Sequence, residues 1–175
     1  ELTNKDKEEK GGKKGCKRIK VKEIRLNAME LDDLESLVKY FFERMKNILH
    51  TEGVYVGINS EYQTLMSSLI GAVIDEKISN FILSRFSTNS DYRENLEKLN
   101  QLINRELKNI KIVIVVDDIE RCDKAKIKDF LFFIKEIAML SHCITIFVVD
   151  YNKLSKIHGI SNDFMEKFFN ERINL

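Results

Sequence analysis

Cysteine and histidine are scarce in this chain, with three of each among 175 residues. The cysteines are far apart and odd in number, which excludes a disulfide framework and a C-x-x-C metal pair. The histidines are scattered as well, so their spacing argues against a zinc site. This use of cysteine favours a reducing compartment, and we expect the protein to be cytoplasmic.

Long apolar runs, proline and an excess of one charge are also missing. No apolar run reaches 18 residues, so no segment predicts a membrane-spanning helix. With no proline and 7 glycines, the composition excludes collagen-like and low-complexity chains. The 29 Lys+Arg residues balance 28 Asp+Glu residues, which leaves no global attraction to nucleic acid or anionic lipid. The 43% hydrophobic content suffices for one core, and the length is too short for two ordinary domains.

The first half of the chain alternates between charged and amphipathic segments. Residues 1–18 are rich in lysine and glycine without apolar periodicity, which predicts a flexible basic segment, either solvated or in contact with phosphate. Residues 19–26 alternate apolar and charged side chains, as an edge strand does. Asp32 and Glu35 resemble a capping box at the start of an amphipathic helix. Further helices are expected over residues 61–86 and 92–107, and a short extended piece at 54–56.

The second half predicts a strand–helix–strand unit. The segment at 111–116 consists of Lys111 and a continuous apolar run of five β-branched side chains, typical of a strand buried on both faces. A helix follows over 124–140 with Asp123 as its N-cap, and a second buried strand over 143–149. This order is that of a βαβ crossover in a parallel sheet. Short helices are expected at 151–157 and 162–169.

A pair of acids, Asp117 and Asp118, directly follows the first buried strand. The carboxyl ends of parallel strands line the crevice in which open α/β sheets bind ligands. Adjacent carboxylates repel and are costly to dehydrate unless a cation neutralises them, and hydrated Mg²⁺ needs only one or two such ligands. An apolar strand followed by two acids is the Walker B arrangement of P-loop NTPases. The alternative is a polar turn that ends the strand and caps the next helix through Asp123.

The sequence Val-Val-Asp-Asp-Ile-Glu-Arg-Cys, residues 115–122, resembles the Walker B signature of the KAP family of P-loop NTPases. Segments that are similar to other parts of the family pattern occur at residues 24–30, 130–137, 146–150 and 164–169. The resemblance covers residues 19–175, which we expect to form a partial domain after the basic segment. It implies a three-layer α/β fold with a mainly parallel sheet of P-loop NTPase type, incomplete because the first strand and the P-loop are missing. The strands at 111–116 and 143–149 are expected to be central, and that at 19–26 to lie toward an edge.

The resemblance also assigns roles to individual residues. Asp117 would be the Mg²⁺ ligand, through water, and Asp118 the catalytic carboxylate, with Glu120 as its substitute. Arg121 would either pair with Glu120 or reach the terminal phosphate of the nucleotide across a subunit interface. Asp150 would be either a polar sensor beside that phosphate or a helix cap. We expect Lys167 to lie on the surface.

Two departures from the family pattern matter. The sequence has no G-x-x-x-x-G-K-[ST] motif, and residues 11–17 lack both its spacing and its terminal hydroxyl residue. The family places this phosphate-binding loop just before the matching segment, so we expect the chain to be a fragment of a longer protein. Many family members also insert transmembrane helices before Walker B, where this chain has amphipathic segments instead.

The resemblance implies that the parent protein binds and hydrolyses ATP with Mg²⁺ and uses the cycle as a conformational switch, with a homo-oligomer as one option. The isolated chain is expected to bind nucleotide very weakly and to be inactive. One alternative is a non-catalytic regulatory or scaffolding domain with a vestigial NTPase fold. Nucleic-acid binding through residues 5–22 is disfavoured, because aromatic side chains are absent there.

Overall fold

The fold was analysed in a computed structural model, which describes residues 18–53 and 90–156 together with residues 166, 168, 171 and 173. The basic segment up to residue 17, the extended piece at 54–56, the helix at 61–86 and the position of Lys167 lie outside the described residues.

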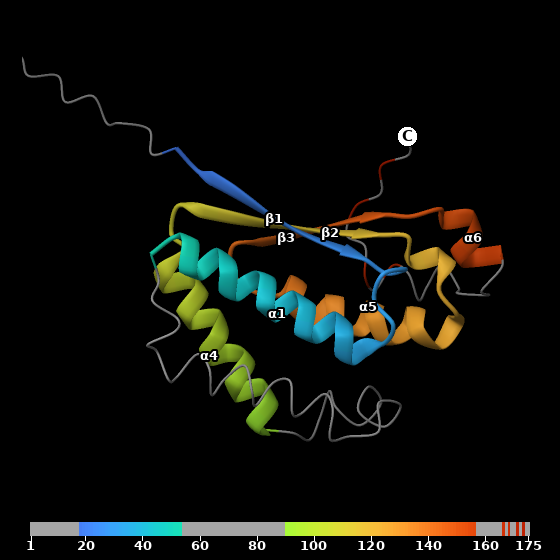
Figure 1. Cartoon of the computed structure of the whole chain (residues 1–175), viewed down its shortest axis with the longest axis horizontal. Coiled ribbons are helices and arrows are strands. Elements are labelled where there is room, and N and C mark those ends of the chain that lie inside the picture. The colour runs from blue at the N-terminus through green and yellow to red at the C-terminus, as the bar shows by residue number, and fades with distance from the viewer. Residues whose placement is uncertain are drawn as a thin grey trace, which may run out of the picture.

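The described elements are three strands, four α-helices and one 3₁₀-helix (Figure 1). In chain order they are β1 (Lys20–Asn27), α1 (Leu34–Thr51), α4 (Ser90–Glu106), β2 (Ile110–Asp117), η1 (Ile119–Arg121), α5 (Lys124–Ala138), β3 (Cys143–Val148) and α6 (Tyr151–Lys156). The strands form a parallel sheet in the order β1-β2-β3. The expected α/β class and parallel sheet are confirmed.

The middle strand of the described sheet is β2, with β1 along one edge and β3 along the other. Ile24 and Leu26 of β1 lie beside Ile114 and Val116 of β2, and all four side chains are buried. The expectation that the 143–149 strand is buried on both faces is wrong for the residues described. Every second side chain of β3 is exposed, and Ile144 is 52% exposed. A short apolar run in the sequence is compatible with a strand that is covered on one face or on both.

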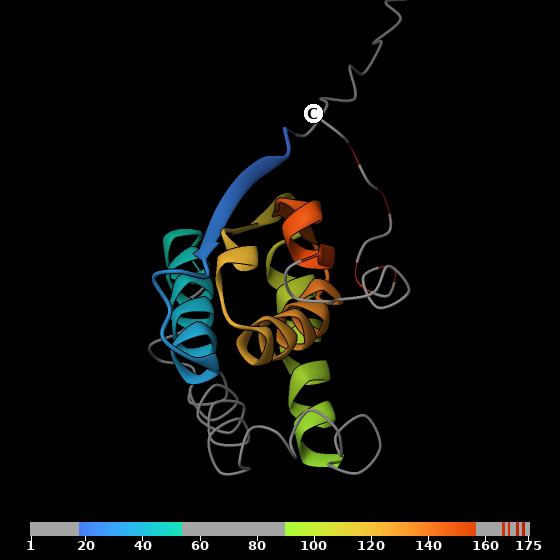
Figure 2. The same ribbon diagram turned by 90° about the vertical axis from the view of Figure 1, so that its right-hand side faces the viewer.

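Helices cover one face of the sheet in the described part of the chain. Figures 1 and 2 both show α1, α4 and α5 on the same side of the three strands. The opposite face, which we call the open face, carries the alternate side chains of each strand. They are Val21, Glu23, Arg25 and Asn27 of β1, Lys111, Val113, Val115 and Asp117 of β2, and Ile144, Ile146 and Val148 of β3. The described residues therefore form two of the three layers that the resemblance implies.

Helix α1 begins one residue later than the sequence pattern predicts. Its N-cap is Asp33, whose Oδ1 accepts a hydrogen bond from the Ser36 N–H at 2.8 Å. The Asp33 N–H donates in return to Ser36 Oγ at 3.0 Å, which completes a capping box. The expected box of Asp32 and Glu35 is wrong, because a serine takes the position where glutamate is more usual. Two possible boxes one residue apart cannot be separated by spacing alone.

Helix α5 connects β2 to β3 and packs on α1. Its N-cap is Asp123, as predicted, with the carboxylate accepting the Lys126 N–H at 2.9 Å. Phe133 of α5 meets Phe41 and Phe42 of α1 edge to face, with ring centroids 5.9 and 6.2 Å away. This aromatic contact holds the two helices together beneath the sheet and so fixes the start of α5 next to the end of β2.

Half-buried Asp129 on α5 makes stability depend on pH. Burial, assisted by the charge of Asp123, raises the pKa of the Asp129 carboxyl above its usual value. Because the pKa of Asp129 is higher in the folded than in the unfolded protein, its protonated form stabilises the fold. This contribution to the free energy of unfolding is complete below the unfolded-state pKa, near 3.9, and is lost as the pH rises through the folded-state pKa. We therefore expect Asp129→Asn to increase the free energy of unfolding at pH 7 and to change it little at about pH 3.5. Urea denaturation at both pH values tests this, with the exposed Asp32→Asn as control; an equal effect at both pH values would contradict it.

Candidate functional site

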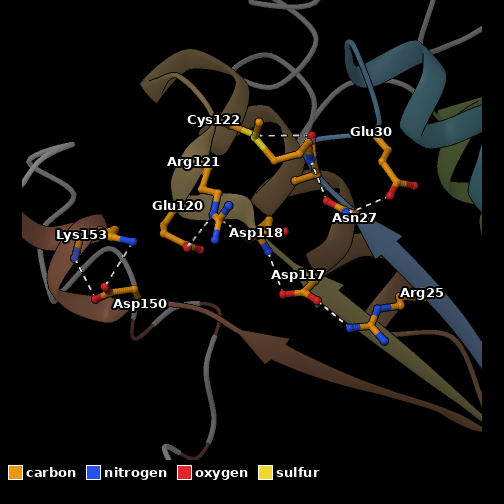
Figure 3. Close-up of polar contacts among 12 residues, drawn as sticks. Arg25, Asn27, Glu30, Asp117, Asp118, Glu120, Arg121, Cys122, Asp150 and Lys153 are labelled. Atoms are coloured by element: carbon orange, nitrogen blue, oxygen red, sulfur yellow. Dashed lines mark hydrogen bonds and ion pairs between the residues drawn. The ribbon is translucent and has the colours of Figure 1, made fainter.

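The carboxyl ends of the three strands come together at one edge of the sheet. Asn27 of β1 and Val148 of β3 both pair with Asp117, the last residue of β2. The chain then continues from Asp117 through η1, and we call residues 117–121 the acidic turn (Figure 3). Helix α6 packs against η1, which places Asp150, just before α6, next to this turn. The five residues singled out by sequence, Asp117, Asp118, Glu120, Arg121 and Asp150, therefore lie along a single edge.

Asp117 is held through both oxygens of its side chain. Oδ1 accepts the backbone N–H of Asp118 at 3.0 Å, and Oδ2 accepts from Arg25 Nη2 at 2.7 Å (Figure 3). The Asp117 side chain is mostly buried, whereas that of Arg25 is 60% exposed. The hydrogen bond to Asp117, and then its charge, raise the pKa of the Arg25 guanidinium. A carboxylate at the end of the central strand is thus already neutralised by a cation from the neighbouring strand.

Asp118 has an unusual backbone and its own cationic partner. Its φ of 59° is left-handed, a conformation that aspartate and asparagine adopt more readily than most residues. This bend turns the chain out of β2 and into η1. Arg121 Nε lies 2.8 Å from Asp118 Oδ1 and 3.9 Å from Glu120 Oε1. Arg121 therefore pairs mainly with Asp118 and only distantly with Glu120, the partner expected from the sequence.

Glu120 is only 7% exposed and is the one charged residue classed as buried in the part of the chain that the structure describes. Removing a carboxylate from water is costly unless hydrogen bonds and opposite charge compensate. The nearby Arg121 guanidinium supplies positive charge. A buried acid beside the Asp118 carboxylate makes this turn strongly polar within an otherwise apolar strand end.

Asp150 acts as a helix cap in this structure. Its Oδ1 accepts the backbone N–H groups of Asn152 and Lys153 at 3.1 and 3.2 Å, and its Oδ2 lies 3.6 Å from Lys153 Nζ. These are the bonds of an N-terminal cap, so the capping alternative is the one observed. The side chain is still about two-fifths exposed, so the cap leaves part of the carboxylate open to solvent.

Cys122 fastens the acidic turn to the chain that leaves β1. Its Sγ donates to the backbone carbonyl of Ala28 at 3.4 Å, and burial raises the pKa of the thiol. Burial also raises the pKa of Cys143 to about 12. Neither thiol is therefore a ready nucleophile at neutral pH, and the role visible for Cys122 is structural.

The oxygen ligands of this edge fit a hydrated Mg²⁺ better than a fully protein-bound metal. Within the described residues there is no group of three or more histidine, cysteine or acidic side chains that could hold a metal ion. Mg²⁺ needs only one or two carboxylates, since water and phosphate oxygens complete its octahedron. Asp117 and Asp118 supply carboxylates that already attract cations in the form of two arginines.

Comparison with known protein families shows to which family the chain belongs. A model of the KAP family P-loop domain matches residues 7–175. The chain belongs to the KAP family of P-loop NTPases. No curated protein and no solved structure matches it. The resemblance drawn from the Walker B segment is thereby confirmed. Membership of this family indicates nucleotide binding as the general function of the KAP domain.

Among the described residues, no helix is both long and apolar enough to cross a bilayer.

No local sequence pattern singles out Arg25, the partner of Asp117 in this KAP domain. In the sequence it is one of several charges on the wet face of a predicted edge strand. Its partner is 92 residues away, so only the parallel register of β1 and β2 brings the two together. A usable signal would have been a prediction of that register, since diagonal neighbours on adjacent strands are about 7–8 Å apart, within reach of arginine.

Proposed function

We propose that this KAP domain binds Mg²⁺–ATP along the acidic turn and hydrolyses it in the complete protein, using the cycle as a conformational switch. The observation that supports this most is the position of Asp117 and Asp118. They end the central buried strand of a parallel sheet, at the edge where such sheets bind ligands, and both already interact with cations.

Each residue of the acidic turn has a place in this proposal. Asp117 would hold Mg²⁺ through a water molecule, and the bound ion would neutralise charge on the phosphate oxygens. Asp118 would orient the attacking water and accept its proton. Its left-handed backbone and its bond to Arg121 fix the direction of that carboxylate. Glu120, buried one turn further on, would be the substitute acid.

Two neighbours would contact the nucleotide rather than the metal. Arg121 is 59% exposed, so it can leave Asp118 for a terminal phosphate, including one held by a second copy of the protein. Asp150 would sense the same phosphate through repulsion between the two negative charges, and its movement would be passed to α6, which it caps. A change in this cap when phosphate binds or leaves would be a direct route from chemistry to a shape change.

The phosphate cradle would come from residues beyond these 175, because no G-x-x-x-x-G-K-[ST] motif occurs among them. Nucleotide affinity and turnover are therefore properties of the complete protein in this proposal. The divalent-ion site, by contrast, can be examined in the chain itself, since both acids belong to it.

Replacement of Asp117 tests the metal site. With Mn²⁺ as a spectroscopic substitute for Mg²⁺, Asp117→Asn is expected to weaken ion binding by tenfold or more, on the order of the loss seen when water-mediated or outer-shell partners are removed. Electron paramagnetic resonance of free Mn²⁺ measures this loss. Asp32→Asn removes an equal charge at an exposed position and serves as the matched control. Equal Mn²⁺ affinity in all three proteins would argue against the proposed site.

A further inference from the structure

Arg25 contacts Asp117, the residue proposed to hold the metal ion. It pairs in register with Val115 and so shares the open face with Asp117, two positions further along β2. Its guanidinium reaches forward to Asp117 Oδ2 at 2.7 Å. The other oxygen, Oδ1, already accepts the Asp118 N–H. Arg25 therefore occupies the Asp117 oxygen that is not already bonded to the acidic turn.

We propose that Arg25 is a built-in competitor of the divalent ion, which occupies Asp117 Oδ2 in the resting protein and is displaced when Mg²⁺ arrives with nucleotide. This inference rests on the proposed function, because it concerns the same metal site. It adds a role for a residue outside the acidic turn and outside the Walker B segment.

The Arg25 side chain can leave without disturbing the core. It is 60% exposed, and an ion pair whose arginine is largely in solvent is weak enough to be exchanged. Glu23 lies on the same open face of β1 two residues earlier, and its charge also attracts Arg25. The guanidinium therefore has a second carboxylate in reach when a divalent ion takes over at Asp117.

The charges of the two cations determine when Mg²⁺ replaces Arg25 at Asp117. A guanidinium carries one delocalised charge, whereas Mg²⁺ carries two charges on a small ion that prefers oxygen ligands. A guanidinium in contact with Oδ2 repels a divalent ion that Asp117 holds through a water molecule, because both carry positive charge. Free Mg²⁺ must therefore compete with Arg25, whereas Mg²⁺ bound to nucleotide gains phosphate contacts that offset the competition.

Removal of Arg25 is expected to strengthen metal binding. In the 175-residue chain, Arg25→Gln should raise the affinity for Mn²⁺ about two- to fivefold, the range that exposed ion pairs span. Arg25→Lys keeps the charge but loses the planar, two-pronged geometry, and should give a smaller increase. The matched control is Arg105→Gln, which removes the same charge from a pair with Glu106 at the end of α4 and should leave Mn²⁺ affinity unchanged.

A second measurement follows Arg25 itself. Nitrogen-15 NMR of arginine side chains, assigned through Arg25→Gln, should show restricted guanidinium rotation in the resting chain and freer rotation after Mg²⁺ is added. Asp117→Asn should free the same signals without any metal.

The outcomes separate this inference from the proposed function. If Asp117→Asn abolishes Mn²⁺ binding while Arg25→Gln leaves it unchanged or weakens it, the competition is refuted and the metal site stands. If Mn²⁺ binding does not depend on Asp117 at all, both are refuted. Stronger binding in Arg25→Gln, lost again in the double variant with Asp117→Asn, is the supporting result.

Discussion

Asp118→Asn is expected to reduce nucleotide hydrolysis by the complete protein by a factor of about 10² to 10⁴, the usual contribution of a general base. An amide can still hydrogen-bond to the attacking water, but it cannot accept the proton. Nucleotide binding should be nearly unchanged, since the charge that faces the metal belongs to Asp117. Single-turnover phosphate release measures the first quantity and equilibrium nucleotide binding the second.

The Asp118→Asn exchange is well suited to this site for a structural reason. Asp118 has a φ of 59°, and asparagine tolerates the left-handed region at least as well as aspartate. Loss of activity would therefore not reflect a misfolded turn. The matched control is Asp123→Asn, the same chemical change five residues later, where asparagine replaces aspartate as an equally good N-cap of α5.

The same experiment separates the two functional classes. A regulatory or scaffolding domain with a vestigial fold predicts that Asp118→Asn changes nothing in any assay of the complete protein. If hydrolysis persists in Asp118→Asn and disappears in Glu120→Gln, the catalytic acid is Glu120, and the assignment of roles within the acidic turn must be reversed. Persistence in both variants would contradict an enzymatic role for this turn.

Phe41→Ala is expected to lower the free energy of unfolding by about 3–5 kcal/mol. The Phe41 ring is fully buried and packs edge to face on Phe42 and Phe133, with centroids 5.2 and 5.9 Å away. Truncation loses the burial of the ring and leaves a cavity at the contact between α1 and α5. Domains have only about 5–15 kcal/mol of stability in total, so the variant should be marginal at 37 °C.

Urea denaturation followed by circular dichroism gives this difference directly. Phe41→Leu fills most of the space and should cost clearly less. Met139→Ala, at a side chain that is 77% exposed, should change stability by no more than about 0.5 kcal/mol. A loss below about 1 kcal/mol in Phe41→Ala would contradict the central position given to this ring.

The elements that the sequence predicts well are those specified by local chemistry. The strand β2, the amphipathic stripe of α1 and the Asp123 cap of α5 depend on residues close together in the chain, and all three are confirmed. The expectation that β2 is buried on both faces is wrong for the described residues, because every second side chain is only partly buried. The predicted capping box was displaced by one residue because neighbouring polar residues compete for the same role. The faces of β3 could not be predicted, since apolar content does not say which neighbours cover a strand.

In the candidate site too, the sequence predicts what depends on neighbouring residues and not what depends on distant ones. The acids of the acidic turn are adjacent in sequence, and their common position at a strand end follows from the pattern alone. Their partners do not follow from it. Whether Arg121 pairs with Asp118 or Glu120 depends on the geometry of a short 3₁₀ turn, and Arg25 reaches Asp117 only through the register of two strands.

The long separation of β1 from β2 has a consequence for the order of folding. Arg25 and Asp117 are 92 residues apart, whereas β2, α5 and β3 follow one another directly. Closing a long loop costs entropy before any contact forms, so nearby pairings form first and distant ones later. We therefore expect β2, α5 and β3 to assemble early and β1 to dock last. During synthesis and refolding Asp117 would then be in place before Arg25 of β1 arrives, and in that interval dissolved cations could reach its carboxylate without competition from Arg25.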